Sequence, residues 1–89
     1  MGIKLMRSID IVWDLPDDPY GNVQHIAEHG LIPLDVEHAM NHPTRQSRSR
    51  SSGLPIVFGR IPSGKVIAVI YEEINDNSIY PITAYEVEE

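Results

Sequence analysis

The sequence predicts a small α+β domain in which one antiparallel sheet carries two short helices on one face, in the order β-α-α-β-β-β. Two stretches between residues 22 and 42 have helical spacing of apolar residues, and the second half of the chain contains apolar runs separated by turn residues. An alternating apolar segment precedes the helices and supplies the first strand. Because 89 residues leave room for one hydrophobic core, we expect residues 1–89 to form a single domain.

The first strand is predicted over residues 9–13, where apolar and polar side chains alternate. Residues 15–21 contain two prolines and three further turn formers, so they are expected to form a loop. Asn22 is expected to cap a helix that begins at Val23 and ends at Gly30.

A second helix is predicted to begin at Pro33 and to end before Pro43, because proline favours the first helical turn and disrupts a helix interior. Both helices are expected to pack on the sheet through apolar residues at helical spacing, namely Ile26, Val36, Ala39 and Met40. Residues 44–53 contain three arginines and no apolar residue, so we expect a mobile surface loop that becomes ordered only with an anionic partner.

A β-hairpin is predicted from residues 56–61 and 66–71, joined by a Pro-Ser-Gly turn. The unbroken apolar run of residues 66–70 is typical of a central strand that is covered on both faces. The last strand is expected over residues 79–87. Pro81 has no N–H to donate, so this strand should lie at an edge of the sheet or contain a bulge.

Charge is distributed unevenly along the chain, whose net charge is −6. Residues 45–65 contain five cations and no acid, whereas the rest contains two cations and all thirteen acids. This stretch either faces phosphate or is solvated and paired with the acidic remainder. The residues considered for RNA binding are therefore Arg45, Arg48, Arg50, Arg60 and Lys65. The chain has no cysteine and no apolar run near the roughly 20 residues of a membrane span, so we expect a cytoplasmic protein.

Several local motifs, taken in order, resemble those of the BrnT family of toxins from bacterial toxin–antitoxin pairs. The resemblance covers nearly the whole chain and rests on the order and spacing of Val12-Trp13-Asp14, Asn22, His29-Gly30, Asp35-Val36-Glu37, Asn41-His42-Pro43, Phe58-Gly59, Val69-Ile70-Tyr71 and Ile82-Thr83-Ala84. It implies the fold of RelE-type ribonuclease toxins, RNA cleavage without a metal or cofactor, and a cognate antitoxin that covers the toxin surface.

Such cleavage needs a base for the ribose 2′-hydroxyl, an acid for the leaving oxygen and cations for the phosphorane charge. Glu28, Leu54 and Tyr85 stand where the resemblance leads us to expect basic residues. The remaining catalytic candidates are two histidines that could act as base or acid near neutral pH, two arginines that could replace a lost arginine, and one tyrosine: His25, His29, Arg48, Arg50 and Tyr85. The alternative is that His29 caps its own helix and Tyr85 packs against the sheet.

All four histidines form i, i+4 pairs, His25 with His29 and His38 with His42. Residues 25–29 also match H-x-x-E-H, the inverted zinc-protease pattern. A five-residue pattern with two wildcards is weak, and a cleft with a third ligand is hard to build in one small core. We therefore expect no metal site and interpret any metal binding by these pairs as adventitious.

Two functions remain open at this point. The chain is either a toxin-like component of a type II toxin–antitoxin pair with metal-independent endoribonuclease activity, or a non-catalytic protein-binding module of the same fold. The expected partners are RNA and a cognate antitoxin in the first case, and an acidic or helical protein in the second. A homodimer is compatible with either function.

Overall fold

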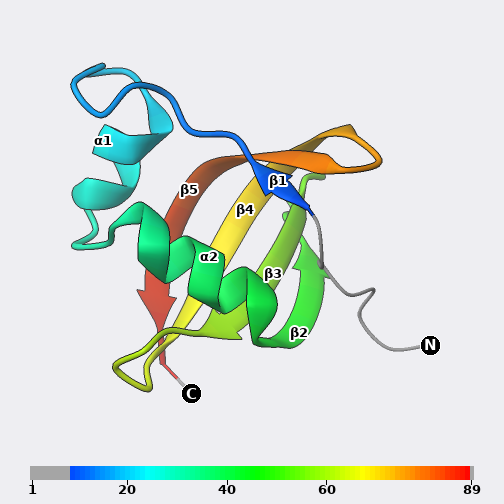
Figure 1. Ribbon diagram of the computed structural model, residues 1–89. Helices are drawn as coiled ribbons and strands as arrows, with labels where there is room; N and C mark the ends of the chain where they lie inside the picture. Colours follow the sequence, from blue (N-terminus) through cyan, green and yellow to red (C-terminus); the bar gives the residue numbers. More distant parts are fainter. Residues whose placement is uncertain (1–8, 89) are drawn as a thin grey trace.

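The computed structural model describes residues 9–88, which form an α+β domain with a mixed sheet (Figure 1). The five strands of this part of the chain are β1 (Asp10–Ile11), β2 (Pro43–Arg48), β3 (Pro55–Arg60), β4 (Val66–Asn75) and β5 (Ser78–Val87), and its two helices are α1 (Asn22–Ala27) and α2 (Pro33–Asn41). The strand order is β1-β5-β4-β3-β2, so β4 is central, as predicted from its apolar run. Neither of the helices described is long and apolar enough to cross a membrane.

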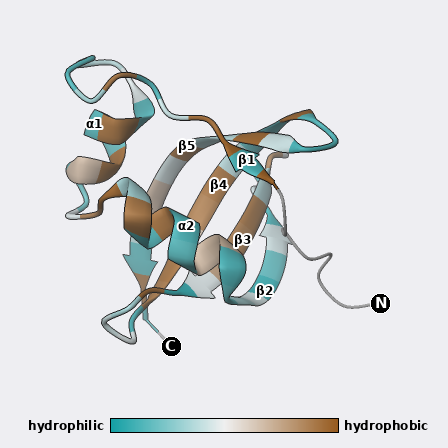
Figure 2. Cartoon of the chain, viewed as in Figure 1, coloured by the Kyte–Doolittle hydropathy of each residue, from teal (hydrophilic) through white to brown (hydrophobic). Residues whose placement is uncertain are grey.

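The helices and the inward side chains of the sheet share one hydrophobic core. Alternate residues of β3 and β4, such as Val57, Ile67 and Val69, are fully buried in the same cluster as the helical residues Ile26, Val36, Ala39 and Met40. Figure 2 shows the largely brown strands β3 and β4 that α2 crosses. The predicted contact of the helices with the sheet through Ile26, Val36 and Met40 is confirmed.

The expectation of a purely antiparallel sheet is wrong at one strand pair. β1 runs parallel to β5, with Asp10 opposite Ser78 and Ile11 opposite Ile79, whereas the other three pairs are antiparallel. The ladder continues through Val12, whose N–H donates to the Ile79 carbonyl oxygen at 2.9 Å. An alternating pattern identifies a strand but carries no information about the direction of its neighbour.

The expectation that residues 44–53 form a loop is wrong for residues 44–48. Residues 43–48 form β2, which pairs with β3 from Pro43 opposite Gly59 to Arg48 opposite Pro55. An edge strand can be polar on both faces because its backbone bonds do not depend on its side chains. A prediction based on apolar residues therefore did not find this strand. The turn that connects it to β3 comprises only residues 49–54.

Pro81 introduces the bulge that was one of its two predicted consequences. Ile70 pairs with Thr83 while the next residue, Tyr71, pairs with Pro81, so one residue of β5 has no opposite position. A residue without an N–H fits such an irregularity, because the ladder is already interrupted there.

Asn22 connects the first strand, the first helix and the last strand. Its side-chain Nδ2 donates to the carbonyl oxygens of Val12 and Pro81, both at 3.0 Å, and its Oδ1 accepts from the Asp14 N–H at 2.9 Å. Asn22 is only 2% exposed and is the first residue of α1, after the N-cap Gly21. The predicted role of Asn22 as N-cap is therefore wrong, because its amide is used for these tertiary hydrogen bonds.

Two glycines allow backbone geometry that other residues would not. Gly30 has a positive φ of 77° and its N–H donates to the Ala27 carbonyl oxygen, but α1 ends at Ala27 with Glu28 as its C-cap, so the predicted cap at Gly30 is wrong by two residues. Gly59 of β3 lies directly under α2, where a Cβ atom would overlap the Ala39 carbonyl oxygen. Only glycine therefore permits the close approach of α2 to β3.

Replacing Asn22 with alanine is expected to lower the free energy of unfolding by about 2–4 kcal/mol, because it leaves three buried or half-buried backbone groups without partners. Urea unfolding followed by circular dichroism measures this change. Asn41→Ala is the matched control, since the exposed Asn41 amide donates to the Glu37 carbonyl oxygen of its own helix, and its effect should be below about 1 kcal/mol. Equal losses in the two variants would contradict the linking role of Asn22.

Candidate functional site

The face of the sheet that points away from the helices carries a row of side chains across four strands. Arg45, Phe58, Ala68 and Tyr85 occupy neighbouring register positions on β2, β3, β4 and β5. They alternate with core residues such as Val57 and Ala84, so they project from the opposite face. We call this set the open-face row; Arg45 and Tyr85 are exposed, Phe58 is half-buried, and the small Ala68 between the two rings is fully buried. With neighbouring strands about 4.8 Å apart, its two aromatic residues lie roughly 10 Å apart on either side of Ala68.

Arg45 and Phe58 are in direct contact within the open-face row. The guanidinium carbon of Arg45 lies 4.1 Å from the centre of the Phe58 ring. Stacking of this kind orients the guanidinium and leaves its N–H donors at the rim of the ring, where they can reach an anion. Arg45 is among the residues that the charge pattern indicated for RNA binding. Its partner Phe58 was not predicted, although the alternation of core residues in β3 places Phe58 on the open face.

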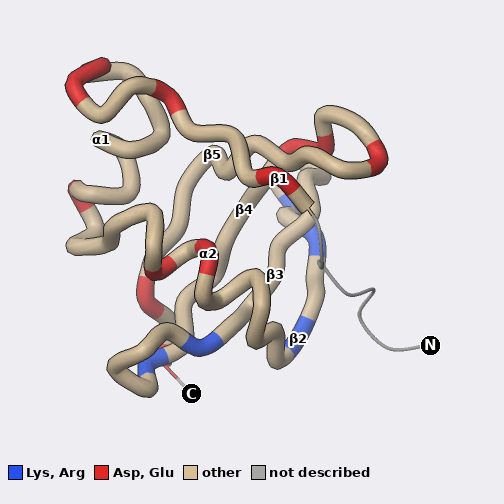
Figure 3. The backbone as a smooth tube through the Cα atoms, in the orientation of Figure 1, with Lys and Arg blue, Asp and Glu red and all other residues tan. Residues whose placement is uncertain are grey.

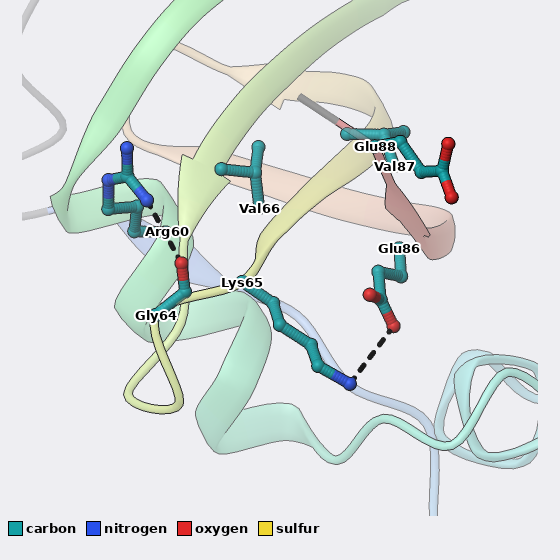
Figure 4. A pocket seen from close by; sticks show the side chains of 7 residues that line it. All are labelled: Arg60, Gly64, Lys65, Val66, Glu86, Val87 and Glu88. Atoms are coloured by element: carbon teal, nitrogen blue, oxygen red, sulfur yellow. Dashed lines mark hydrogen bonds and ion pairs between the residues drawn. The ribbon is translucent and has the colours of Figure 1, made fainter.

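Arg60 and Lys65 lie at the end of the sheet where the β3–β4 turn meets the end of β5. They line a cavity of about 380 Å³ together with Gly64, Val66, Glu86, Val87 and Glu88 (Figure 4). Lys65 Nζ lies 3.5 Å from Glu86 Oε1, so its charge is largely balanced, whereas the Arg60 guanidinium donates to the Gly64 carbonyl oxygen. Within residues 9–88 none of the arginines forms an ion pair, and Arg60 is the free cation of this cavity.

His25, His29 and Tyr85 come together at the outer edge of β5. The His29 ring centre lies 6.1 Å from that of Tyr85 and 6.3 Å from that of His25. The three side chains are exposed, because α1 ends beside β5 rather than over it (Figure 1). Three of the five catalytic candidates therefore share one site, and Tyr85 joins this site to the open-face row.

Arg48 and Arg50, the other two catalytic candidates, do not reach this site. Arg48 follows Arg45 by three residues and thus projects from the opposite face of β2, where its Nη1 donates to the Gly53 carbonyl oxygen at 2.7 Å. β2 and β5 are separated by β3 and β4, a span of roughly 14 Å. Figure 3 shows that the basic residues follow β2 and the β3–β4 turn, away from α1. The five candidates do not converge.

The second histidine pair lies at the end of α2. The rings of His38 and His42 are stacked with their centres 4.1 Å apart. Each Nδ1 lies within hydrogen-bond distance of a carbonyl oxygen, that of Arg60 for His38 and that of His38 for His42, so each Nδ1 must donate. No cluster of three or more potential metal ligands occurs between residues 9 and 88, which includes the H-x-x-E-H segment.

Asp14 and Tyr80 form a titratable pair that the sequence did not reveal. The Tyr80 hydroxyl donates to Asp14 Oδ2 at 2.5 Å, and the Asn22 N–H donates to the same oxygen at 2.9 Å. These bonds favour the ionised carboxylate, so the pKa of Asp14 is lowered. The same hydrogen bond, with burial, raises the pKa of Tyr80 to about 12. The pair fastens the loop before α1 to β5 beside the Asn22 amide.

Comparison of the chain with known family models, curated proteins and solved structures found no match.

The Asp14–Tyr80 pair is expected to make stability depend on pH at the alkaline end. The pKa of Tyr80 rises from 10.0 to about 12 on folding. The contribution of Tyr80 to the stability of the fold is therefore complete below pH 10 and is lost as the pH approaches 12. Tyr80→Phe should therefore lower the melting temperature at pH 7. It should also reduce the fall in melting temperature between pH 10 and pH 12. Tyr20→Phe is the control, because Tyr20 is 94% exposed. Parallel pH profiles for wild type and Tyr80→Phe would refute this assignment.

Proposed function

We propose that this protein is a toxin-like component of a type II toxin–antitoxin pair that binds single-stranded RNA across the open face of its sheet. The observation that carries the proposal is the open-face row, in which Phe58 and Tyr85 flank the small Ala68 and Arg45 stacks on Phe58. Unpaired bases stack on aromatic rings of such sheet faces, and arginines beside the rings neutralise phosphates. Arg60, two residues further along β3 and on the same face as Phe58, extends the cationic side.

The same face supports metal-independent cleavage next to Tyr85. His29 could accept the 2′-hydroxyl proton of a ribose held beside the Tyr85 ring, and His25 could protonate the leaving oxygen. Among residues 9–88 no arginine or lysine belongs to this cluster, since Arg48 and Arg50 lie at the other edge of the sheet. A missing cation commonly costs about 10²–10³ in rate, so we propose slow cleavage.

A non-catalytic protein-binding module is the second candidate. The separation of Arg48 and Arg50 from His29 favours it, because a phosphorane formed beside Tyr85 would meet no fixed cation. In this alternative the open-face row contacts a partner protein, and the histidines have no chemical role. Cleavage measurements distinguish the two functions.

RNA binding is expected to depend on which face of β2 carries the charge. Arg45→Glu and Tyr85→Ala should each weaken the binding of a fluorescent oligouridylate about tenfold or more at low salt. Arg48→Glu is the matched control: it makes the same charge change on the opposite face of the strand and should have a much smaller effect. Fluorescence anisotropy measures the affinities. Equal weakening by Arg45→Glu and Arg48→Glu would mean that RNA is bound without use of the open face.

Cleavage, where it occurs, is expected to persist in EDTA and to depend on His29. His29→Gln should reduce the rate about 100-fold, because it removes the proton acceptor but keeps a polar side chain of similar size. His42→Gln is the control on the other helix and should leave the rate unchanged. Rates follow from gel analysis of labelled RNA under single-turnover conditions. Full activity in His29→Gln, or cleavage that requires added Zn²⁺, would overturn the proposed chemistry.

A further inference from the structure

β2 presents unpaired backbone groups at one edge of the sheet. It is the last strand on its side within residues 9–88, and residues 44–48 are all exposed. The Ser49 N–H donates to the Leu54 carbonyl oxygen at 2.8 Å, which identifies a hydrogen-bonded pair at the end of the ladder. Because such pairs alternate with non-bonded ones, Arg45 and Ser47 bond to β3, while Gln46 and Arg48 direct their N–H and C=O groups outward. Pro55 has no N–H and lies opposite Arg48, whose N–H and C=O groups do not bond to β3. This pairing agrees with the alternation.

The side chains along this edge carry positive charge. Arg45 and Arg48 lie on β2 and Arg50 in the turn that follows, and the sequence from His38 to Tyr71 contains no acid. Within the described residues these arginines form no ion pair. The edge therefore combines backbone donors and acceptors with cations on both faces of the strand.

We propose that the β2 edge binds an extended, acidic segment of a partner protein as an additional antiparallel or parallel strand. The outward N–H and C=O groups of Gln46 and Arg48 supply the backbone hydrogen bonds, and the arginines select carboxylates. Arg45 and Arg48 project from opposite faces, so the segment carries acidic side chains on both of its faces, at positions three residues apart.

The same features disfavour the other occupants of a free edge. A second copy of this chain paired through β2 would bring two sets of three arginines together, which like-charge repulsion opposes. RNA offers phosphates but not the alternating N–H and C=O pattern that the edge presents. The β2 edge shares only Arg45 with the open-face row, and its backbone pairing involves none of the histidines, so this inference does not require the protein to cleave RNA.

The test uses the full chain and a fluorescent nine-residue peptide of threonine and valine that contains two glutamates three residues apart. Fluorescence anisotropy should show saturable binding of this peptide. A peptide of the same sequence, N-methylated at the residues whose N–H groups would face β2, should not bind. Gln46→Pro removes an outward N–H without removing a bond to β3, and should weaken binding about tenfold. Gln46→Ala, which keeps the N–H, is the matched control and should bind within about twofold of wild type.

Several outcomes would overturn the proposal. The first is absence of binding to the wild-type chain, and the second is equal binding of the N-methylated peptide, which would reduce the interaction to charge alone. The comparison of the two peptides decides the question even if Gln46→Pro does not fold. Displacement of the peptide by an oligouridylate, with the same loss in Arg48→Glu, would assign the edge to RNA. Sedimentation of the free protein as a dimer that Gln46→Pro dissociates would assign it to a second copy.

Discussion

The hydrogen bonds of the Asn22 amide hold together segments that hydrophobic contact alone would leave unaligned. The loop between β1 and α1 contains two prolines and is largely exposed, and β1 contributes only two residues to the sheet. Asn22 joins Val12 at the end of this short strand to Pro81 at the bulge of β5. A buried amide with its donors and acceptor satisfied resists displacement, because every alternative position leaves buried polar groups unpaired. The position of α1, and with it of His25 and His29 beside Tyr85, depends on this connection.

The alternation of side chains along a strand then decides which charged residues can act together. Arg45 and Arg48 are close in sequence and similar in exposure, yet the three-residue spacing sends them to opposite faces of β2. One stacks on Phe58 in the open-face row, and the other donates to the turn at Gly53. A cluster of arginines in the sequence thus becomes two surfaces. The proposed RNA contact uses Arg45, whereas the proposed strand addition uses the backbone of β2 together with Arg45 and Arg48.

Most of the fold could be predicted from local patterns, and the errors share one physical cause. The two helices, the central β4 and the bulge at Pro81 follow from apolar spacing and from the chemistry of proline and glycine. The parallel direction of β1, the strand β2 and the tertiary role of Asn22 depend instead on hydrogen bonds to the backbone, which leave no apolar signature. The candidate site shows the same limit: the histidine spacing identified His25 and His29, but only the packing of α1 beside β5 brings Tyr85 to them, and only the strand order separates Arg48 from them.

The acidic residues of the chain limit how a nucleic acid can approach the cations. The cations lie on β2 and around the β3–β4 turn, where Glu86 and Glu88 lie beside them, whereas most other acids lie in the loop before α1, on α2 and around the β4–β5 turn (Figure 3). With a net charge of −6, the molecule as a whole repels nucleic acid at long range, and at physiological salt the field of a charged group extends only about 8 Å. A polyanion must therefore approach within a few ångströms of Arg45 or Arg60 before attraction outweighs repulsion. Recognition on this surface consequently depends on short-range contacts, which are ring stacking at Phe58 and Tyr85 or backbone pairing at β2. Charge then selects among the ligands that can make these contacts.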